Sequence, residues 1–416
     1  MGSTEIPRII PLTEAQVPDR LPLIRSLMAN IAHHDWTRVT PVAQPGLEQG
    51  DQPDNHVLLD HAPLKDELPS TTSIHTVTYL VEDFQTLTQR AAKEGDEADQ
   101  IRQALGDQKV WHGPAWATLA ISPGFTSCAD KYPEFAWYML SAGIDVIVIE
   151  HRGHGYSLRE TSDLTSVHIS DWHCYISDFA QSCLYAYEAH HLRAPLCVWG
   201  HSMGGAIATG AVEKYPDMFT AAVFSSPMYL PRTGVPTSFT HWLARRFVAA
   251  GKAEEPALGK REFDSAMAQE EENVREGKDR GSRSAARQYN FREVRKLKVA
   301  EHTLNATWGW VDQALSMDAE ITSVQNLAKI SIPVLLMTAG KDFYVDVDAQ
   351  KKVAQKAHQL GLRLTAFFFP GARHELFYDI DPIVKRYMNL VVEFYWQATH
   401  GNKEVQEVQE EKKERR

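Results

Sequence analysis

A five-residue motif in the middle of the chain constrains the fold more than any other feature: Gly200, His201, Ser202, Met203 and Gly204. It follows a short apolar run, residues 195–199, and leads into a helical stretch of small residues. This order of strand, sharp turn carrying a serine, and helix is a nucleophile elbow. The flanking glycines are needed because the turn is strained and a side chain there would strike a neighbouring element. The motif therefore predicts an accessible serine, Ser202, at the carboxyl end of a buried strand.

A serine at such a turn needs a base and a carboxylate, because its hydroxyl is a weak nucleophile until a base takes the proton. In chains with this elbow the carboxylate comes next and the histidine last, each after a late strand. Two apolar runs fit this order, since residues 332–337 lead to Asp342 and residues 364–369 lead to His374. We predict that Asp342 orients the general base His374, and Asp346 is the alternative carboxylate.

The chemistry of an attacking serine also requires donors for the oxyanion, which are usually two backbone N–H groups. One is expected from Met203, directly after the nucleophile. The other is expected from the loop after an earlier strand, residues 117–122, where Gly124 allows a sharp turn and leaves the Phe125 N–H to face the site. A plain turn without this role is the competing interpretation.

Together these residues resemble a known family, the α/β-hydrolases that include bacterial lysophospholipases and monoacylglycerol lipases. The resemblance covers residues 117–396 and includes the segments 122–125, 143–157 and 372–375 in the order of the family. Lysophospholipases are the nearer branch, because monoacylglycerol lipases typically have His-Gly where this chain has Pro123 and Gly124. Glu150 stands where many relatives carry Asp.

The resemblance implies a serine carboxylic-ester hydrolase that releases a fatty acid from a single-acyl lipid, a lysophospholipid before a monoacylglycerol. It implies no metal and no organic cofactor. A general esterase, thioesterase or peptidase is the alternative within the same fold, because one triad serves many reactions. An acyl acceptor other than water would make the enzyme a transacylase. A catalytically idle scaffold or ligand-binding protein is the alternative outside enzymology.

Alternation of apolar runs and helical patterns predicts an α/β fold with a mostly parallel sheet and helices on both faces. Strands are expected near residues 73–82, 117–122, 144–150, 195–199, 220–225, 332–338 and 363–369. The α/β-hydrolase core is predicted in two parts, 71–226 with an insertion at 85–115, and 326–400. A partly irregular extension, 1–70, precedes it. A charged tail, 401–416, follows and is expected to be disordered, with a lone solvated helix as the alternative.

The stretch 227–325 breaks this alternation and is predicted to form a helical lid. Five apolar residues in it are candidates for substrate binding: Phe239, Trp242, Leu243, Trp308 and Trp310. A lid with an apolar underside suits an acyl chain, because each buried CH₂ group contributes about 0.8 kcal/mol. These aromatic residues could equally serve only to pack the lid onto the core. The charge-rich part, residues 252–301, is expected to be a solvated helix face.

The formal net charge of −11 argues against a nucleic-acid partner and against electrostatic attachment to anionic lipid as a main anchor. No apolar run approaches the length needed to span a bilayer, so any membrane contact is expected to be peripheral. The start of the chain does not resemble a secretory signal. Four cysteines without paired spacing predict buried thiols in a reducing, cytoplasmic compartment. The oligomeric state stays open at this stage.

Overall fold

The computed structural model describes residues 6–39 and 67–414, and these contain one large sheet. Its strands are β1 (His33–Arg38), β2 (Ser73–Tyr79), β3 (Ala117–Ser122), β4 (Ile144–Ile149), β6 (Leu196–His201), β7 (Ala222–Ser225), β9 (Val334–Ala339) and β10 (Leu364–Phe369). Their order in space is β1-β2-β4-β3-β6-β7-β9-β10. The strands from β4 to β10 are parallel to one another, whereas β1 and β2 are antiparallel to their neighbours. The predicted mostly parallel sheet is thus confirmed.

Helices cover both faces of this sheet, because each face carries apolar side chains that must be buried. On one face lie α1 (Val17–Ala29), α2 (Val81–Gln89), α3 (Asp96–Leu105), α4 (Pro133–Ser141) and α13 (Asp381–Glu414). On the other lie α5 (His173–Ala189), α6 (Met203–Lys214), α11 (Val324–Leu327) and α12 (Val347–Gln359).

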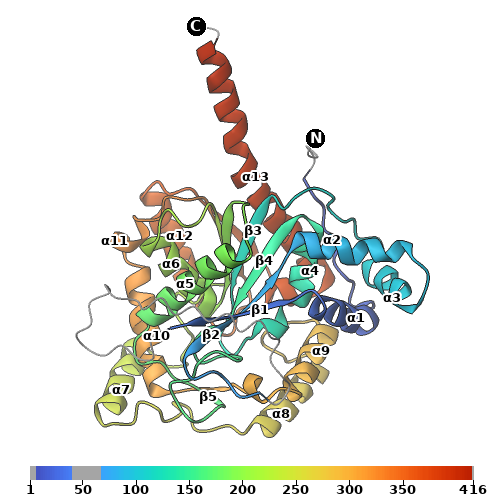
Figure 1. Ribbon diagram of the computed structural model, residues 1–416. Helices are drawn as coiled ribbons and strands as arrows, with labels where there is room; N and C mark the ends of the chain where they lie inside the picture. Colours follow the sequence, from blue (N-terminus) through green and yellow to red (C-terminus); the bar gives the residue numbers. More distant parts are fainter. Residues whose placement is uncertain (1–5, 40–66, 415–416) are drawn as a thin grey trace.

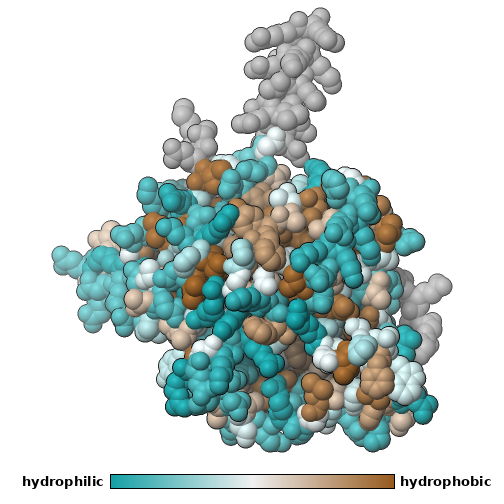
Figure 2. Space-filling model, turned by 180° about the vertical axis from the view of Figure 1, so that it is seen from behind, coloured by the Kyte–Doolittle hydropathy of each residue, from teal (hydrophilic) through white to brown (hydrophobic). Residues whose placement is uncertain are grey.

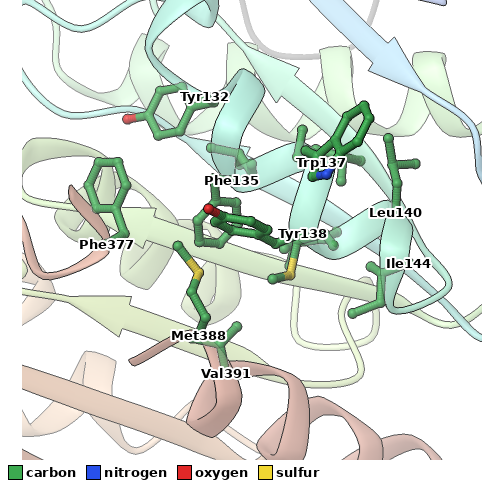
Figure 3. Close-up of a cluster of buried hydrophobic side chains, with 14 of the residues drawn as sticks. Tyr132, Phe135, Trp137, Tyr138, Leu140, Ile144, Phe377, Met388 and Val391 are labelled. Carbon is green, nitrogen blue, oxygen red and sulfur yellow. The ribbon is translucent and has the colours of Figure 1, made fainter. Parts of the chain in front are cut away.

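Aromatic side chains fill the core beneath α4. Figure 3 shows Phe135 and Tyr138 of this helix near Met388 and Val391 of α13, with Phe377 close by. All five side chains are almost completely buried. Seen from behind, the surface is mainly hydrophilic, with separate hydrophobic patches (Figure 2).

The N-terminal extension is more ordered than the sequence indicated. It contains helix α1, whose buried Leu21 and Ile24 lie in the same core as α4, and strand β1, which pairs with β2 at the edge of the sheet. The edge of a sheet carries unpaired backbone N–H and C=O groups with which a further strand can form hydrogen bonds. Strand β1 therefore depends on a partner that is distant in the sequence. Residues 1–5 and 40–66 of the predicted extension lie outside the described residues.

The structure also describes two other segments singled out in the sequence. The predicted insertion, 85–115, holds the end of α2 and all of α3, whose buried Ile101 joins the same core as α1. The predicted tail is helical as far as Glu414, as the last part of α13, which projects from the body at the top of Figure 1. The four cysteines are free thiols; Cys174 is partly buried and the other three are fully buried.

Residues 227–325 form a mainly helical layer at the edge of the body opposite the projecting end of α13 (Figure 1). Its helices are α7 (Thr237–Ala249), α8 (Phe263–Arg275), α9 (Ala285–Lys296) and α10 (Trp308–Ile321). The short strand β8 (Asn305–Ala306) in this layer pairs with β5 (Ser166–Val167) of the core segment. This pairing attaches the layer to the core.

The turn between β6 and α6 is crowded on every side. A Cβ atom on Gly200 would lie 2.5 Å from the Gly204 carbonyl oxygen, and one on Gly204 would overlap the carbonyl oxygens of Ser122 and Pro123. Gly200 is therefore required because α6 passes close to the end of β6, and Gly204 is required because α6 starts in contact with the end of β3 and the loop after it. These contacts are the steric reason for the two glycines of the motif.

A buried arginine, Arg287 on α9, connects the layer to three other parts of the chain. Its guanidinium donates to the Glu134 carboxylate of α4 at 2.9–3.1 Å, to the Leu12 carbonyl at 2.8 Å and to the Asp379 carbonyl at 3.3 Å. Glu14 adds a second link, since its carboxylate accepts the Ala286 N–H at 2.8 Å at the start of α9. The N-terminal segment thus helps to hold α9 in place.

We expect Arg287→Met to lower the free energy of unfolding by about 3–5 kcal/mol, because it leaves the Glu134 carboxylate buried without its partner. Urea unfolding followed by circular dichroism measures the loss. Arg246→Met, on the exposed face of α7, is the control and should change stability by less than about 0.5 kcal/mol. Equal losses in the two variants would contradict this role of Arg287.

Gly204→Ala tests the crowding at the turn. A helix normally gains about 1 kcal/mol from this substitution, but the overlap with backbone atoms should cost about 3 kcal/mol or more, so the net effect is destabilising. Gly401→Ala in α13 has nothing within 4 Å of its added Cβ and should be neutral or stabilising. Thermal unfolding of the two variants gives the comparison, and a stable Gly204→Ala protein would refute the steric argument.

Candidate active site

Ser202 lies where the sequence predicted it, between β6 and α6, in a strained backbone conformation with φ of 55°. Hydrogen bonds on both sides hold it there. Its N–H donates to the Ser225 carbonyl at 3.1 Å, and its carbonyl accepts from the Met228 N–H at 2.8 Å and the Gly205 N–H at 2.9 Å. A non-glycine residue in this conformation persists only where its surroundings impose it, which is typical of functional sites.

Asp342 and His374 are in direct contact at the ends of β9 and β10. The Asp342 Oδ2 atom lies 2.6 Å from His374 Nδ1, while Oδ1 accepts the N–H groups of Tyr344 and Val345 at 2.9 and 3.0 Å. Asp346, the alternative carboxylate, instead caps α12 by accepting the Ala349 N–H at 2.8 Å. The structure therefore pairs His374 with Asp342.

The Asp342 carboxyl is 4% exposed, and burial by itself would favour its neutral form. The electrostatic interaction with His374, the hydrogen bond to its ring and the two backbone N–H groups outweigh burial and lower the pKa of Asp342 below its usual value. The carboxylate therefore stays charged at neutral pH, where it can hold the Nδ1–H tautomer of His374.

Ser202 and His374 both line one cavity of about 620 Å³. Among the described residues, no hydrogen bond joins the Ser202 hydroxyl to the His374 ring. Hydrogen bonds between catalytic groups commonly tighten in the substrate complex. The structure thus brings the three predicted residues to one edge of the sheet, with the His374–Asp342 hydrogen bond formed.

Phe125 and Met203, the two residues expected to supply oxyanion donors, flank Ser202. Among the described residues, no hydrogen-bond acceptor is paired with the backbone N–H of either one. Gly124 is needed for this approach, because a Cβ atom on it would lie 2.9 Å from His201 Nδ1 and 3.3 Å from the Ser202 Cβ. Phe125 itself lines the cavity and its ring lies 4.4 Å from that of Trp310.

His201, next to the nucleophile, is buried behind the site. Its Nε2 atom lies 3.4 Å from the His374 carbonyl oxygen, and burial moves the pKa of its ring well below the usual value. A neutral ring adds no positive charge beside His374. Its place fits a role in supporting the loop that carries the base.

Of the five lid residues singled out in the sequence, only Trp310 lines the cavity. The ring of Trp308 stacks on that of Phe247 with 4.4 Å between centroids, so it packs α10 against α7. Trp308 thus has a packing role and does not line the cavity. Leu243, on α7, is partly buried but does not reach the cavity. Phe239 and Trp242 are 50% and 56% exposed on the outer surface of α7. A helical stripe in sequence shows that a face is apolar, but only packing decides what that face meets.

The cavity wall formed by α8, α9 and the adjoining loops is charged, which the sequence did not indicate. Four arginines of the stretch predicted to be a solvated helix face line it: Arg261, Arg280, Arg292 and Arg295. Arg292 and Arg295 are only 3% and 5% exposed. A signal was present, because these two residues are three apart and share one face of a helix. Which face would be buried depended on tertiary packing.

The described residues hold no group of three or more histidine, cysteine, aspartate or glutamate side chains arranged to bind a metal ion. Within the same part of the chain, none of the helices combines the length and the apolar character needed to cross a bilayer.

Comparison with known proteins places this site in a family. Residues 113–381 match the model of the hydrolase family described as serine aminopeptidase, S33. A probable lysophospholipase L2 of Haemophilus influenzae is 25% identical over 274 residues, which cover 64% of this chain and 79% of that protein. Human monoglyceride lipase is 29% identical over 127 residues, 30% of this chain and 40% of that protein.

Solved structures agree on the fold. A carboxyl esterase from Bacillus coagulans has a TM-score of 0.57 at 14% identity, covering 79% of this chain and 94% of its own. A soluble variant of monoglyceride lipase from Saccharomyces cerevisiae has a TM-score of 0.56 at 13% identity, covering 82% and 96%. The family model extends over most of the sheet, from before β3 to the start of α13. The chain belongs to the serine aminopeptidase S33 family of α/β-hydrolases and is a hydrolase of the serine type.

Proposed function

We propose that this protein hydrolyses the carboxylic ester of a single-acyl lipid, and that lysophospholipids are preferred to monoacylglycerols. The observation that carries the proposal is the Asp342–His374 pair, bonded at 2.6 Å, whose histidine lines the same cavity as Ser202. The cavity volume of about 620 Å³ falls within the range of small-molecule sites. Its wall combines aromatic and charged side chains, which suits an amphipathic ester.

In the proposed mechanism Ser202 attacks the ester carbonyl while the His374 Nε2 atom takes its proton. Asp342 stabilises the imidazolium that forms, and the N–H groups of Phe125 and Met203 bind the oxyanion. His374 then gives the proton to the leaving alcohol. Water activated by the same histidine attacks the acyl-enzyme, which releases the fatty acid and restores Ser202.

Names of relatives support the lipid substrate. The proteins from Haemophilus influenzae and Escherichia coli that match this chain are described as probable lysophospholipase L2 and lysophospholipase L2. The match to the Escherichia coli protein covers only 37% of its length. Monoacylglycerol hydrolysis is the second candidate, because the human relative is a monoglyceride lipase.

We further propose that substrate is taken from a lipid surface by peripheral contact. Phe239 and Trp242 on α7 are half-exposed, and Leu258, at the rim of the cavity, is 97% exposed. Transfer of such side chains from water to an apolar phase is favourable by about 25 cal/mol for each Å² of apolar surface removed from water.

Release of fatty acid from a panel of lysophosphatidylethanolamine, lysophosphatidylcholine, monoacylglycerol and short-chain esters tests the activity. We expect the purified protein to hydrolyse the lysophospholipids most efficiently, and Ser202→Ala to lower kcat by about 10⁴-fold or more because it lacks the nucleophile. Turnover of short esters alone would point to a general esterase. An inactive wild-type protein would favour a scaffold or binding role.

A matched pair of variants tests the carboxylate. Asp342→Asn should lower kcat by about 10⁴-fold, because the amide favours the wrong tautomer of His374. Asp346→Asn should keep both activity and stability, since asparagine caps a helix about as well as aspartate. Steady-state kinetics of the two proteins on the best substrate of the panel decides between the carboxylates. Loss of activity in Asp346→Asn but not in Asp342→Asn would overturn the assignment.

A further inference from the structure

Four arginines line the cavity wall, and we call three of them, Arg261, Arg292 and Arg295, the arginine cluster. Arg292 and Arg295 are three residues apart on α9, and both approach Glu270 of α8. Arg292 Nη1 donates to the Glu270 carbonyl at 3.3 Å, and Arg295 Nη1 lies 4.0 Å from its carboxylate. The two side chains therefore lie beside each other.

Arg261 joins them through the segment that leads to β8. Its Nη2 atom donates to the Leu304 carbonyl at 3.1 Å, and Arg295 Nη2 donates to the carbonyl of the preceding residue, Thr303, at 2.8 Å. Arg261 and Arg295 are thus both attached to the same short segment. All three arginines of the cluster line the cavity with Ser202 and His374.

The cluster is poorly neutralised by the protein itself. Among the described residues, the 4.0 Å contact of Arg295 with Glu270 is the one ion pair within this distance for the whole cluster. Asp279 lies in the same wall, but its Oδ1 atom accepts the N–H groups of Gly281 and Ser282 at 2.8 Å.

Two other buried arginines of this chain have carboxylate partners at close range. Arg152 has Asp178 and Glu160 at 2.9 Å, and Arg287 has Glu134 at 2.9 Å. A buried charge normally needs such a partner, because removal from water is costly. Arg292 is similarly buried, but among the described residues it has no carboxylate within 4.0 Å: its one hydrogen bond is to a backbone carbonyl, and the Asp279 carboxyl acts on it only at longer range. Arg292 therefore lacks the close counter-ion that the other two have.

The charge of the cavity points the same way. Its wall contains five cationic side chains, Lys131 and four arginines, but only three carboxylates, although the chain as a whole carries a formal net charge of −11. Lys131 is already paired with Glu375, so the surplus lies on the arginines. A local positive field in an acidic protein favours an anionic ligand at this wall.

We propose that the arginine cluster binds the phosphodiester group of a lysophospholipid while Ser202 attacks the acyl ester of the same molecule. Planar guanidinium groups bind phosphate oxygens in pairs, which fixes the orientation of the head group as well as adding affinity. A monoacylglycerol has no charge to place there. The inference rests on the proposed function and deepens it, because it names the chemical group that would set lysophospholipids above neutral esters.

The test compares Arg261→Gln, Arg292→Gln and Lys296→Gln. Lys296 lies on α9 as well but points outward, where it pairs with Glu293 at 2.7 Å, so it is a matched loss of charge outside the cavity. We measure kcat/KM for lysophosphatidylethanolamine below its micellar concentration and for the neutral ester p-nitrophenyl butyrate. The ratio of the two values is the readout, because it cancels losses that come from folding or from the catalytic groups.

We expect the ratio to fall about tenfold or more in Arg261→Gln and Arg292→Gln, mainly through KM, and to stay unchanged in Lys296→Gln. Arg292→Lys should recover part of the loss, because it restores the charge without the paired donors. Arg261 is exposed, so its variant tests the idea even if Arg292→Gln is unstable.

Failure of this inference and failure of the proposed function have different signatures. A wild-type protein that hydrolyses lysophospholipid, with an unchanged ratio in both arginine variants, would overturn the phosphate site alone. An equal fall of the ratio in Lys296→Gln would also overturn it. The preference for the anionic substrate would then depend on positive charge in general and not on the arginines of the cavity. A wild-type protein that cleaves monoacylglycerol but no lysophospholipid would contradict the substrate class itself.

Discussion

The close approach of helix α6 to strands β3 and β6 is the constraint on which the rest of the site depends. Any side chain at Gly200 or Gly204 would enter space held by backbone atoms. At this turn Ser202 has a positive φ and lines the cavity, with Phe125 and Met203 beside it. Because the neighbouring strands are parallel, the loops that carry Asp342 and His374 end at the same edge of the sheet. A strained turn and a parallel sheet together therefore assemble groups that are 172 positions apart in the sequence.

The helical layer over this edge is held by polar contacts as well as by apolar packing. Arg287 binds Glu134 of the core, Leu12 of the N-terminal segment and Asp379 in the loop after His374. One buried side chain thus joins the wall of the cavity to the loop of the base. Breaking such a network leaves buried charges without partners, so position and stability are coupled here. The N-terminal segment, which lies before the residues matched by the family model, takes part in building the site.

The cavity has two chemical characters that correspond to the two ends of a lysophospholipid. Aromatic side chains such as Phe125 and Trp310 lie near the nucleophile, and the arginine cluster lies in the wall contributed by α9 and the loops around it. The first suits an acyl ester and the second a phosphodiester. A neutral monoacylglycerol has no charged group for the second. The proposed preference therefore depends on charge in the layer rather than on the triad, which both classes of enzyme require.

The sequence by itself determined the core of the fold and the identity of Ser202, Asp342 and His374 as candidates. These predictions rest on local patterns: glycines at a strained turn, apolar runs at strand spacing, and polar residues just after them. Tertiary structure alone decided what each ambiguous face would meet. Trp308 packs between helices, Phe239 remains exposed, and Arg292 is buried in the cavity wall although its stretch is rich in charge. Strand β1 likewise formed because the edge of a distant strand was open to it. Periodicity reveals that a segment has a face, but burial is a property of two surfaces in contact, and the second surface is far away in the chain.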